Sequence, residues 1–467
     1  MEFEGQRRPG PLWCGRSAYS FQQEWDSEFV LEEFIGSNIP KYAIISHRWS
    51  NNEASYQTFE KGSKTIGNSQ YQNGSYGWDK IDAACQIARS RELDWLWIDT
   101  CCIDKKSSAE LSEAINSMFN WYQRAEECYV LLPDVADDTA AFRRAAHAEE
   151  GTVVNAAKIG YEMWDPQDFI KSTWFTRAWT VQELLAPSRV LFYTTDFNCL
   201  GSKMDLQDLI SDATKVPLIF ITQNDMIHRA SVAERMKWAS RRQATREEDL
   251  AYSMLGLFGV NMPLLYGEGN KAFLRLQTEI IRTSDDETIF GWSGKSHYNT
   301  NGLLAPDIAA FSTVSDIRRH YVVPRQHYEV TNKGIRITLP LRRPQLEQAF
   351  AKSGEVRVLM LLNCADYLHA YGPREEGSSF GILVILRRDT RGLHRDSRLR
   401  QMQPALGDRI SLRPIKSVKS IAETANESGD TYYVVRGNDG SMGFCDLVSP
   451  ATEEDAINVP VYFSTGW

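Results

Sequence analysis

Short apolar runs alternate with longer amphipathic segments along the first part of the chain. Each run has five or six residues and is followed by polar residues, as is typical of buried strands that end in turns. The runs cover residues 42–46, 93–98, 128–132 and 189–193. Residues 78–89 and 107–125 repeat apolar side chains at helical spacing, and Ser107 with Glu110 forms a capping-box pattern. This alternation predicts a mainly parallel, doubly wound sheet whose ligand site lies beyond the carboxyl ends of the strands.

Three further patterns lie outside these runs. Residues 174–185 predict one helix, which Pro187 ends. Helical spacing dominates residues 201–295, whereas strict alternation over Ile335–Leu341 predicts strands. We therefore expect four segments: residues 1–40 as a lead-in, 41–200 as an α/β domain, 201–295 as its helical extension, and 300–467 as a β-rich domain.

Composition narrows the classes of partner and compartment. The chain has 467 residues and a formal net charge of −9, and we expect no nucleic-acid partner because a basic stripe is lacking. The pairs Arg241-Arg242 and Arg387-Arg388 are interpreted as solvated ends of helices or strands. The eight Cys include no CxxC pair, and no apolar run reaches the roughly 18 to 20 residues of a membrane span. We expect a cytoplasmic protein with reduced thiols and no membrane span.

Three ordered motifs resemble those of fungal heterokaryon incompatibility (HET) domains. They are residues 42–49 (YAIISHRW), residues 97–104 (WIDTCCID) followed by Glu110 and Met118, and residues 174–184 (WFTRAWTVQEL). The resemblance covers about residues 30–292 and does not reach the β-rich end. Arg48 and Lys105 stand where other residues are more common in the family. An extra cation there either suits the phosphates of a dinucleotide or has only a surface role.

HET domains are in turn similar in organisation to TIR domains. The resemblance implies a TIR/flavodoxin-like sheet, with the strand near Trp95 at one edge and the strand near Tyr42 beside it. TIR enzymes that cleave NAD need a Glu on the third helix, within the plant pattern Trp-Cys-x-x-Glu-Leu. Trp179 to Leu184 match that spacing, with Thr180 in place of Cys. The match implies NAD as the substrate, Glu183 as the catalytic residue and no metal.

Polar residues around the three motifs are the candidates for binding NAD. They are Ser46, His47, Arg48, Trp49, Asp99, Asp104, Arg177 and Trp179. The structural alternative places Trp179 in the core and pairs Glu183 with Arg177, and treats the residues after the first strand as a surface turn. If Glu183 faces solvent, Glu183→Gln should change the free energy of unfolding by only about half a kcal/mol.

Two other chemistries are disfavoured. Asp99 and Asp104 lack the His neighbours of a typical transition-metal site, and we interpret them as ribose ligands or helix caps. A thiol nucleophile built from His47 and either Cys101 or Cys102 is disfavoured because both Cys follow a buried strand, and buried thiols are usually inert.

Two functions from different classes remain open. The first is an NAD glycohydrolase that is switched on by self-association. The second is a signalling or scaffold module that acts through homotypic contacts or a partner immune protein, without chemistry. The resemblance places either one in fungal self/non-self recognition, programmed cell death and innate immunity.

Overall fold

The computed structural model describes part of the chain, and every structural statement below refers to that part. Its residues are 12–16, 29–34, 36–49, 53–57, 76–136, 164–292, 303–314, 317–319, 328–331, 334–342, 355–366, 379–388, 402–404, 410–415, 433–434 and 456–463. The chain divides into two compact units. The first contains residues 1–227, 242–245 and 252–264, and the second contains residues 228–241, 246–251 and 265–467.

The first unit is built on a seven-stranded sheet of order β2-β1-β4-β3-β5-β6-β7. Its strands are β1 (Leu12–Arg16), β2 (Phe29–Glu33), β3 (Tyr42–Ser46), β4 (Trp95–Trp97), β5 (Glu127–Leu131), β6 (Val190–Tyr193) and β7 (Cys199–Ser202). Strands β4, β3, β5 and β6 are parallel, as the four apolar runs predicted. All five residues of β3 and β5 are buried, because helices cover both faces of a parallel sheet.

The predicted edge position of β4 is wrong. Strand β1 pairs with β4 antiparallel, joining Cys14 to Leu96 and Gly15 to Trp95, and β2 pairs with β1. Phe34, just after β2, packs edge-on against Trp95 with ring centroids 4.6 Å apart. Strand β1 was missed because its sequence, LWCGR, has no clear period-two alternation and contains a Gly.

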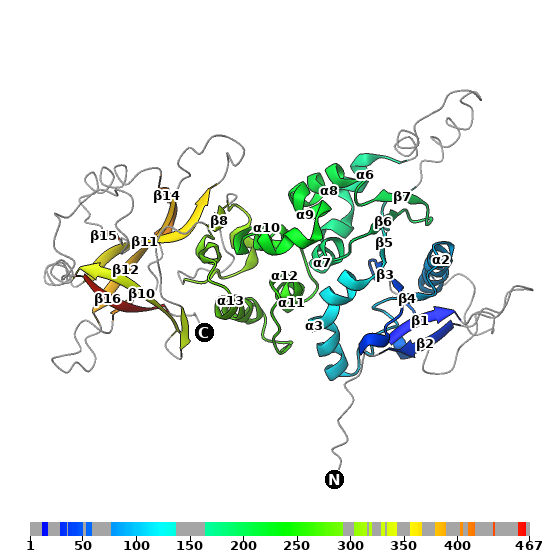
Figure 1. The fold of residues 1–467 in the computed structure, drawn as a ribbon, viewed down its shortest axis with the longest axis horizontal. Coiled ribbons are helices and arrows are strands. Elements are labelled where there is room, and N and C mark those ends of the chain that lie inside the picture. Colours follow the sequence, from blue (N-terminus) through cyan, green and yellow to red (C-terminus); the bar gives the residue numbers. More distant parts are fainter. Residues whose placement is uncertain are drawn as a thin grey trace, which may run out of the picture. The chain divides into compact units, whose positions relative to one another are not determined.

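Helices α2 (Tyr76–Ser90) and α3 (Ser108–Arg124) link the first parallel strands. Figure 1 shows α2 on one side of β3 and β4, with α3 and α7 (Thr180–Leu185) on the other. The predicted capping box of α3 is half formed. Ser107 accepts a hydrogen bond from the Glu110 N–H, but the Glu110 carboxylate accepts from the Asp104 N–H instead.

The single helix predicted over residues 174–185 is wrong. A 3₁₀ turn, η2 (Thr173–Thr176), is followed by a break and then by α7. Backbone bonds to a distant residue explain the break: the Ala178 N–H donates to the Gln243 carbonyl, and the Gln243 N–H donates to the Thr176 carbonyl. These groups are unavailable for a continuous helical ladder.

The rest of the first unit is mostly helical, in agreement with the spacing of residues 201–264. It contains η1 (Gly36–Asn38), α6 (Pro166–Lys171), α8 (Gln207–Thr214), α9 (Leu218–Thr222), η3 (Asn224–Arg229) and α12 (Leu255–Phe258). Helix α12 lies against α3, where Asn116 exchanges hydrogen bonds with the backbone of Met262. These segments therefore help to hold the helix that covers β3.

The second unit combines helices with a nine-stranded sheet, which confirms the predicted β-rich end. Its helical elements are α10 (Val232–Ala239), α11 (Glu247–Tyr252), α13 (Lys271–Thr283), η4 (Glu287–Phe290) and η5 (Ile308–Phe311). Its strands are β8 (Ile317–Arg319), β9 (Glu329–Thr331), β10 (Gly334–Arg342), β11 (Glu355–Asp366), β12 (Ser379–Arg388), β13 (Met402–Pro404), β14 (Ile410–Ile415), β15 (Tyr433–Val434) and β16 (Ala456–Phe463). The strand order is β15-β11-β12-β13-β16-β10-β9, with β14 on β12 and β8 on β11.

Candidate functional site

The first and third sequence motifs meet at the carboxyl end of β3. Ser46, the last residue of the strand, donates a hydrogen bond from Oγ to Glu183 Oε2 at 2.5 Å. The same Oγ accepts a hydrogen bond of 2.8 Å from Nε1 of the buried Trp174. Tyr122 of α3 donates to the Ile45 carbonyl at 2.8 Å and so fixes the strand end. Residues 137 positions apart are thus joined by one short hydrogen bond.

The second motif reaches the same strand end through Asp99, which follows β4. Asp99 Oδ2 accepts a hydrogen bond of 2.7 Å from Trp49 Nε1, and Oδ1 lies 3.8 Å from His47 Nε2. The Lys105 ammonium lies over the Trp49 ring, 3.4 Å from its centroid. Trp49 remains 47% exposed. An aromatic plane with a cation beside it therefore lies at the edge of the sheet, as expected for a cation–π contact.

The surroundings of Glu183 raise the pH at which its carboxyl ionises. Burial raises the pKa of the Glu183 carboxyl to about 7, although the Ser46 hydrogen bond and Arg177 favour the carboxylate. Asp99 opposes ionisation, whereas Arg242 favours it. Desolvation therefore exceeds the attraction of two cations. Glu183 as a whole residue keeps some accessible surface.

Burial keeps His47 neutral. Its pKa is well below the usual value because burial disfavours the cation, and Lys80 adds repulsion that Glu53 partly offsets. Among the described residues, neither ring nitrogen has a hydrogen-bond partner. A neutral imidazole offers one donor and one acceptor to a ligand.

Next to His47, the buried Lys80 of helix α2 forms an ion pair with Glu53. Lys80 Nζ lies 2.6 Å from Glu53 Oε1, and only 1% of the Lys80 side chain is exposed. Burial lowers the pKa of Lys80, while Glu53 opposes that shift. Sequence reasoning did not place Lys80 in the site. A signal was present, because Lys80 lies four residues before Ala84 and eight before Ala88, on the apolar stripe of its helix.

Two arginines connect the site to α7. Arg177 Nη1 donates to the His47 carbonyl at 3.1 Å. Arg242 donates from Nη1 to the Arg177 carbonyl at 3.0 Å and to Thr180 Oγ1 at 2.7 Å. The interpretation of Arg242 as a solvated residue is wrong, since it is only 6% exposed, whereas Arg241 is exposed. Nothing in the polar pair Arg241-Arg242 indicated that one of the two arginines would be buried.

The structure brings together Ser46, His47, Trp49, Asp99, Arg177 and Glu183. Arg48 is exposed, and Trp179 is a half-buried N-cap of α7 without a side-chain capping bond. Asp104 accepts from the Lys106 N–H and from Gln57, so its carboxylate shapes its own turn. These three residues lie outside the hydrogen-bond network that the described side chains form around Glu183.

Thiol chemistry finds little support in the same region. Cys101 and Cys102 are buried with their Sγ atoms 4.0 Å apart, and burial raises the pKa of Cys102 well above its usual value. A thiol with a raised pKa is a poor nucleophile. Within the described ranges, no three His, Cys, Asp or Glu side chains group as metal ligands would.

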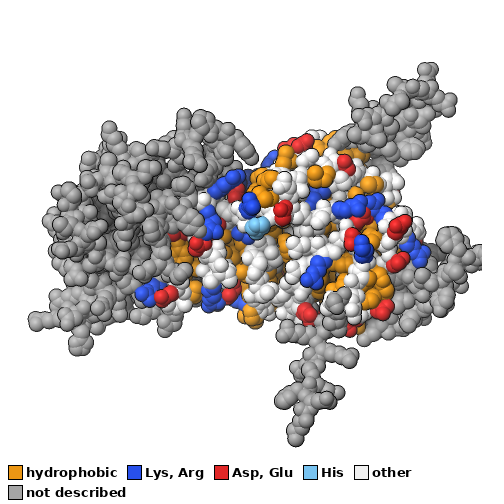
Figure 2. Space-filling model, in the orientation of Figure 1, with side chains coloured by type: hydrophobic (Ala, Val, Ile, Leu, Met, Phe, Trp, Pro, Cys, Tyr) orange, Lys and Arg blue, Asp and Glu red, His pale blue; other side chains and the backbone are white. Residues whose placement is uncertain are grey.

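Surface charge and hydropathy of the described residues add two observations. On the face that Figure 2 shows, cationic and anionic side chains are interspersed. Among the helices of the described ranges, none has the length and apolar character of a membrane crossing.

Comparison with known proteins finds a matching family and a similar relative. Residues 42–183 match the family described as "Heterokaryon incompatibility protein (HET)". The chain is similar to the vegetative incompatibility protein HET-E-1 of Podospora anserina, with 40% identity over 252 residues. That alignment covers 53% of this chain and 17% of the relative, so the chain spans only a small part of the relative's length. No solved structure matches the chain.

Proposed function

We propose that this chain, whose residues 42–183 match the heterokaryon incompatibility (HET) family, is a TIR-like NAD glycohydrolase acting in incompatibility and cell death. Glu183 is the catalytic residue, and NAD is the substrate. The observation that carries the proposal is the 2.5 Å hydrogen bond from Ser46 to Glu183, which joins the first and third motifs at the carboxyl end of a parallel strand. Ligands of such sheets bind at that edge.

The reaction needs little more than a placed carboxylate. The bond between ribose C1′ and the nicotinamide nitrogen breaks, nicotinamide leaves as a neutral molecule, and C1′ gains oxocarbenium character. An ionised Glu183 stabilises that positive charge. Water then adds to C1′ and releases one proton, which gives ADP-ribose. No general acid is required, because the leaving nitrogen starts as a cation.

The electrostatics of the site suit a cationic substrate. Free Glu183 is close to half ionised at neutral pH, since its pKa is about 7. The positive charge of a bound nicotinamide ring beside Glu183 stabilises the carboxylate, which burial deprives of solvent. His47 supplies an unused donor and acceptor for substrate hydroxyl or amide groups. Trp49 supplies an exposed aromatic face.

A second candidate function is a signalling module without chemistry. The observation in its favour is that Ser46 and Glu183 already satisfy each other, which is also how a structural hydrogen bond looks. In that case the chain acts by self-association or by binding another incompatibility protein.

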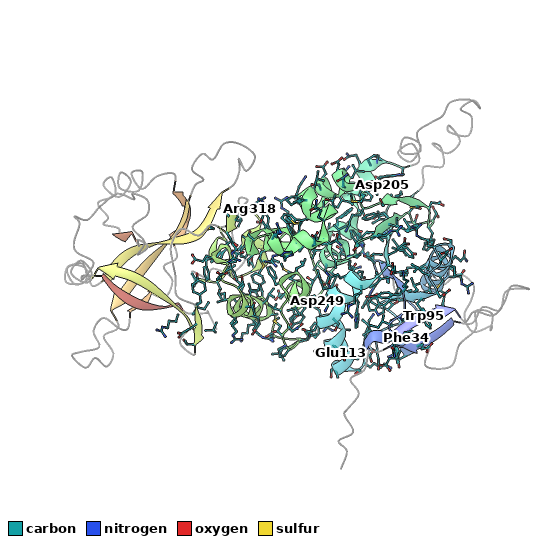
Figure 3. The ribbon with its side chains drawn as sticks, in the orientation of Figure 1. Phe34, Trp95, Glu113, Asp205, Asp249 and Arg318 are labelled. Carbon is teal, nitrogen blue, oxygen red and sulfur yellow. The ribbon has the colours of Figure 1, made fainter. Side chains whose placement is uncertain are left out.

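An NAD-consumption assay on the purified chain, with and without forced clustering, separates the two functions. We expect Glu183→Gln to lower kcat by about 10² to 10³, the usual effect of losing one strong electrostatic stabiliser. The matched control is Glu113→Gln on the neighbouring helix α3, labelled in Figure 3, which should keep the parent rate. Turnover by Glu183→Gln at the parent rate would move the catalytic role to another carboxylate, first Asp99 and then Glu53. A parent chain that consumes no NAD even when clustered would support the signalling module.

A further inference from the structure

Helix α7 is too short to hold Glu183 in place by itself. It has six residues, and its N-cap residue Trp179 makes no side-chain capping bond. Isolated helices shorter than about 12 residues are marginal in water. The position of Glu183 therefore depends on the groups that bind the two ends of this helix.

A buried lysine grips the carboxyl-terminal end. Lys203 Nζ donates to the Pro187 carbonyl at 2.7 Å, to the Leu184 carbonyl at 3.4 Å, and to Asn224 Oδ1 at 3.0 Å. Asn224 in turn donates from Nδ2 to the Ala186 carbonyl at 2.9 Å. Lys203 is 1% exposed. Cations near the last carbonyls of a helix are stabilised by its dipole, which helps to offset the cost of burying this charge.

The turn that presents Lys203 is itself fixed. Asp205, labelled in Figure 3, accepts hydrogen bonds from the Ser202 N–H at 2.9 Å and from Ser202 Oγ at 2.6 Å. The Lys203 N–H also donates to the Val190 carbonyl at 2.8 Å. The lysine thus projects from a tight turn at the end of β7 and is not a mobile surface side chain.

A buried arginine grips the amino-terminal end. Arg242 binds the Arg177 carbonyl and Thr180 Oγ1, the first residue of α7. Thr180 Oγ1 also lies within hydrogen-bond distance of the Trp174 carbonyl, at 2.8 Å. The next residue, Gln243, forms the two backbone bonds that separate η2 from α7. Arg242 also acts on Glu183 through space, where its charge favours the carboxylate.

We propose that Arg242, Lys203 and Asn224 are positioning residues for Glu183. They hold α7 from both ends, and the charge of Arg242 in addition favours the ionised form of the Glu183 carboxyl. All three come after residue 183, where the match to the HET family ends. The inference rests on the proposed function. It implies that residues after the family match at residues 42–183 complete the NAD site.

The groups around Glu183 define a pH test. Arg177 and Arg242 favour its ionised form, and Asp99 opposes it. Tyr122 and Cys128 also face it, but burial raises the pKa of both well above the usual value, so they stay neutral. In the full chain, kcat/KM for NAD should rise with pH and level off above the Glu183 pKa. Arg242→Gln should move this rise to higher pH, because it removes a positive charge that favours the carboxylate.

Three more variants separate charge from position. Arg242→Lys keeps the charge and should leave the pH rise near that of the parent while lowering kcat. Lys203→Met fills the same space without a charge and should lower kcat more than it raises KM. The pH at which kcat/KM rises should stay that of the parent. Arg241→Gln, at the exposed neighbour, is the matched control and should behave as the parent.

A double-mutant cycle tests the coupling between Arg242 and Glu183 and does not depend on NAD cleavage. Unfolding of the parent, Arg242→Gln, Glu183→Gln and the double variant is measured at pH 5.5 and pH 8.5. We expect a coupling of at least about tenfold in the folding equilibrium constant at pH 8.5, when Glu183 is ionised, and a smaller one at pH 5.5. Such coupling in a chain that cleaves no NAD would support the positioning role of Arg242 and refute the NAD function. Equal coupling at both pH values, or Arg242→Gln and Lys203→Met variants with parent kinetics, would overturn the inference.

Discussion

At the scale of single residues, the central fact is that Glu183 ionises against the preference of the fold. Its pKa is about 7, against an ordinary value of 4.5. The unfolded chain therefore loses this proton at lower pH than the folded chain does. Stability from this group is complete below about pH 4.5 and decreases as the pH rises through 7. A functional group that costs stability at its working pH is a known pattern of active sites.

Glu183→Gln should consequently be more stable than the parent at pH 8 and closer to it at pH 5. Gln has no charge to desolvate, so the stability difference should grow by about 1 to 3 kcal/mol over this range and then level off. Urea unfolding of both proteins at several pH values measures it. The half-buried position of Glu183 overturns the expectation that a solvent-facing Glu is replaced at little change in stability.

The matched control for this measurement is again Glu113→Gln, which leaves Glu183 in place and should keep the parent's loss of stability as the pH rises through 7. A Glu183→Gln variant that is less stable than the parent at pH 8 would show that the Ser46 hydrogen bond and the two arginines outweigh desolvation. The carboxylate would then be a structural group.

Sequence reasoning reached the residues at the strand ends and those in the three motifs, and it missed Lys80 and Arg242. Ser46, His47 and Asp99 end or follow apolar runs, where parallel topology places ligand residues. Arg242 approaches from a polar stretch with no strand or strong periodicity near it. Only the tertiary fold shows that it is buried. Lys80 is intermediate, because its place on an apolar stripe was readable.

At the scale of elements, the central strands were predictable and their neighbours were not. Parallel strands buried on both faces are continuous apolar runs, which are easily recognised. Strands β1, β2 and β7 are antiparallel additions with mixed composition, and β1 also pairs with β4, which is distant in sequence. The break between η2 and α7 escaped prediction for the same reason, since Gln243 causes it.

The contact between α12 and α3 offers a test of packing around the strand end. A Cβ added to Gly256 would lie 2.0 Å from Phe119 Cβ, an atom close to the α3 backbone that cannot rotate away. Gly256→Ala should therefore destabilise the first unit by about 1 to 3 kcal/mol. Thermal unfolding measures the change. A neutral Gly256→Ala would mean that α12 is free to shift away from α3.

At the scale of the whole molecule, the two units are interleaved along the chain. The first unit takes in residues 242–245 and 252–264, which lie between segments of the second. The family match ends at residue 183, well before these segments. The boundary expected at residue 200 remains a prediction from the sequence, but contacts of the α/β unit continue beyond it. They include Lys203 under α7, Gln243 at the η2–α7 break, and Met262 against α3.

These contacts lead to a prediction about truncated chains. A chain of residues 1–200 lacks Lys203, Asn224, Arg242 and α12, and it should show no cooperative unfolding, because α7 and α3 lose their supports. A chain of residues 1–295 keeps every segment of the first unit and should retain amide protection in β3 and β5. Hydrogen exchange followed by mass spectrometry compares both with the full chain. Equal protection of β3 in the two truncated chains would show that the α/β sheet is complete without the later segments, and that Lys203 and Arg242 are dispensable for holding Glu183.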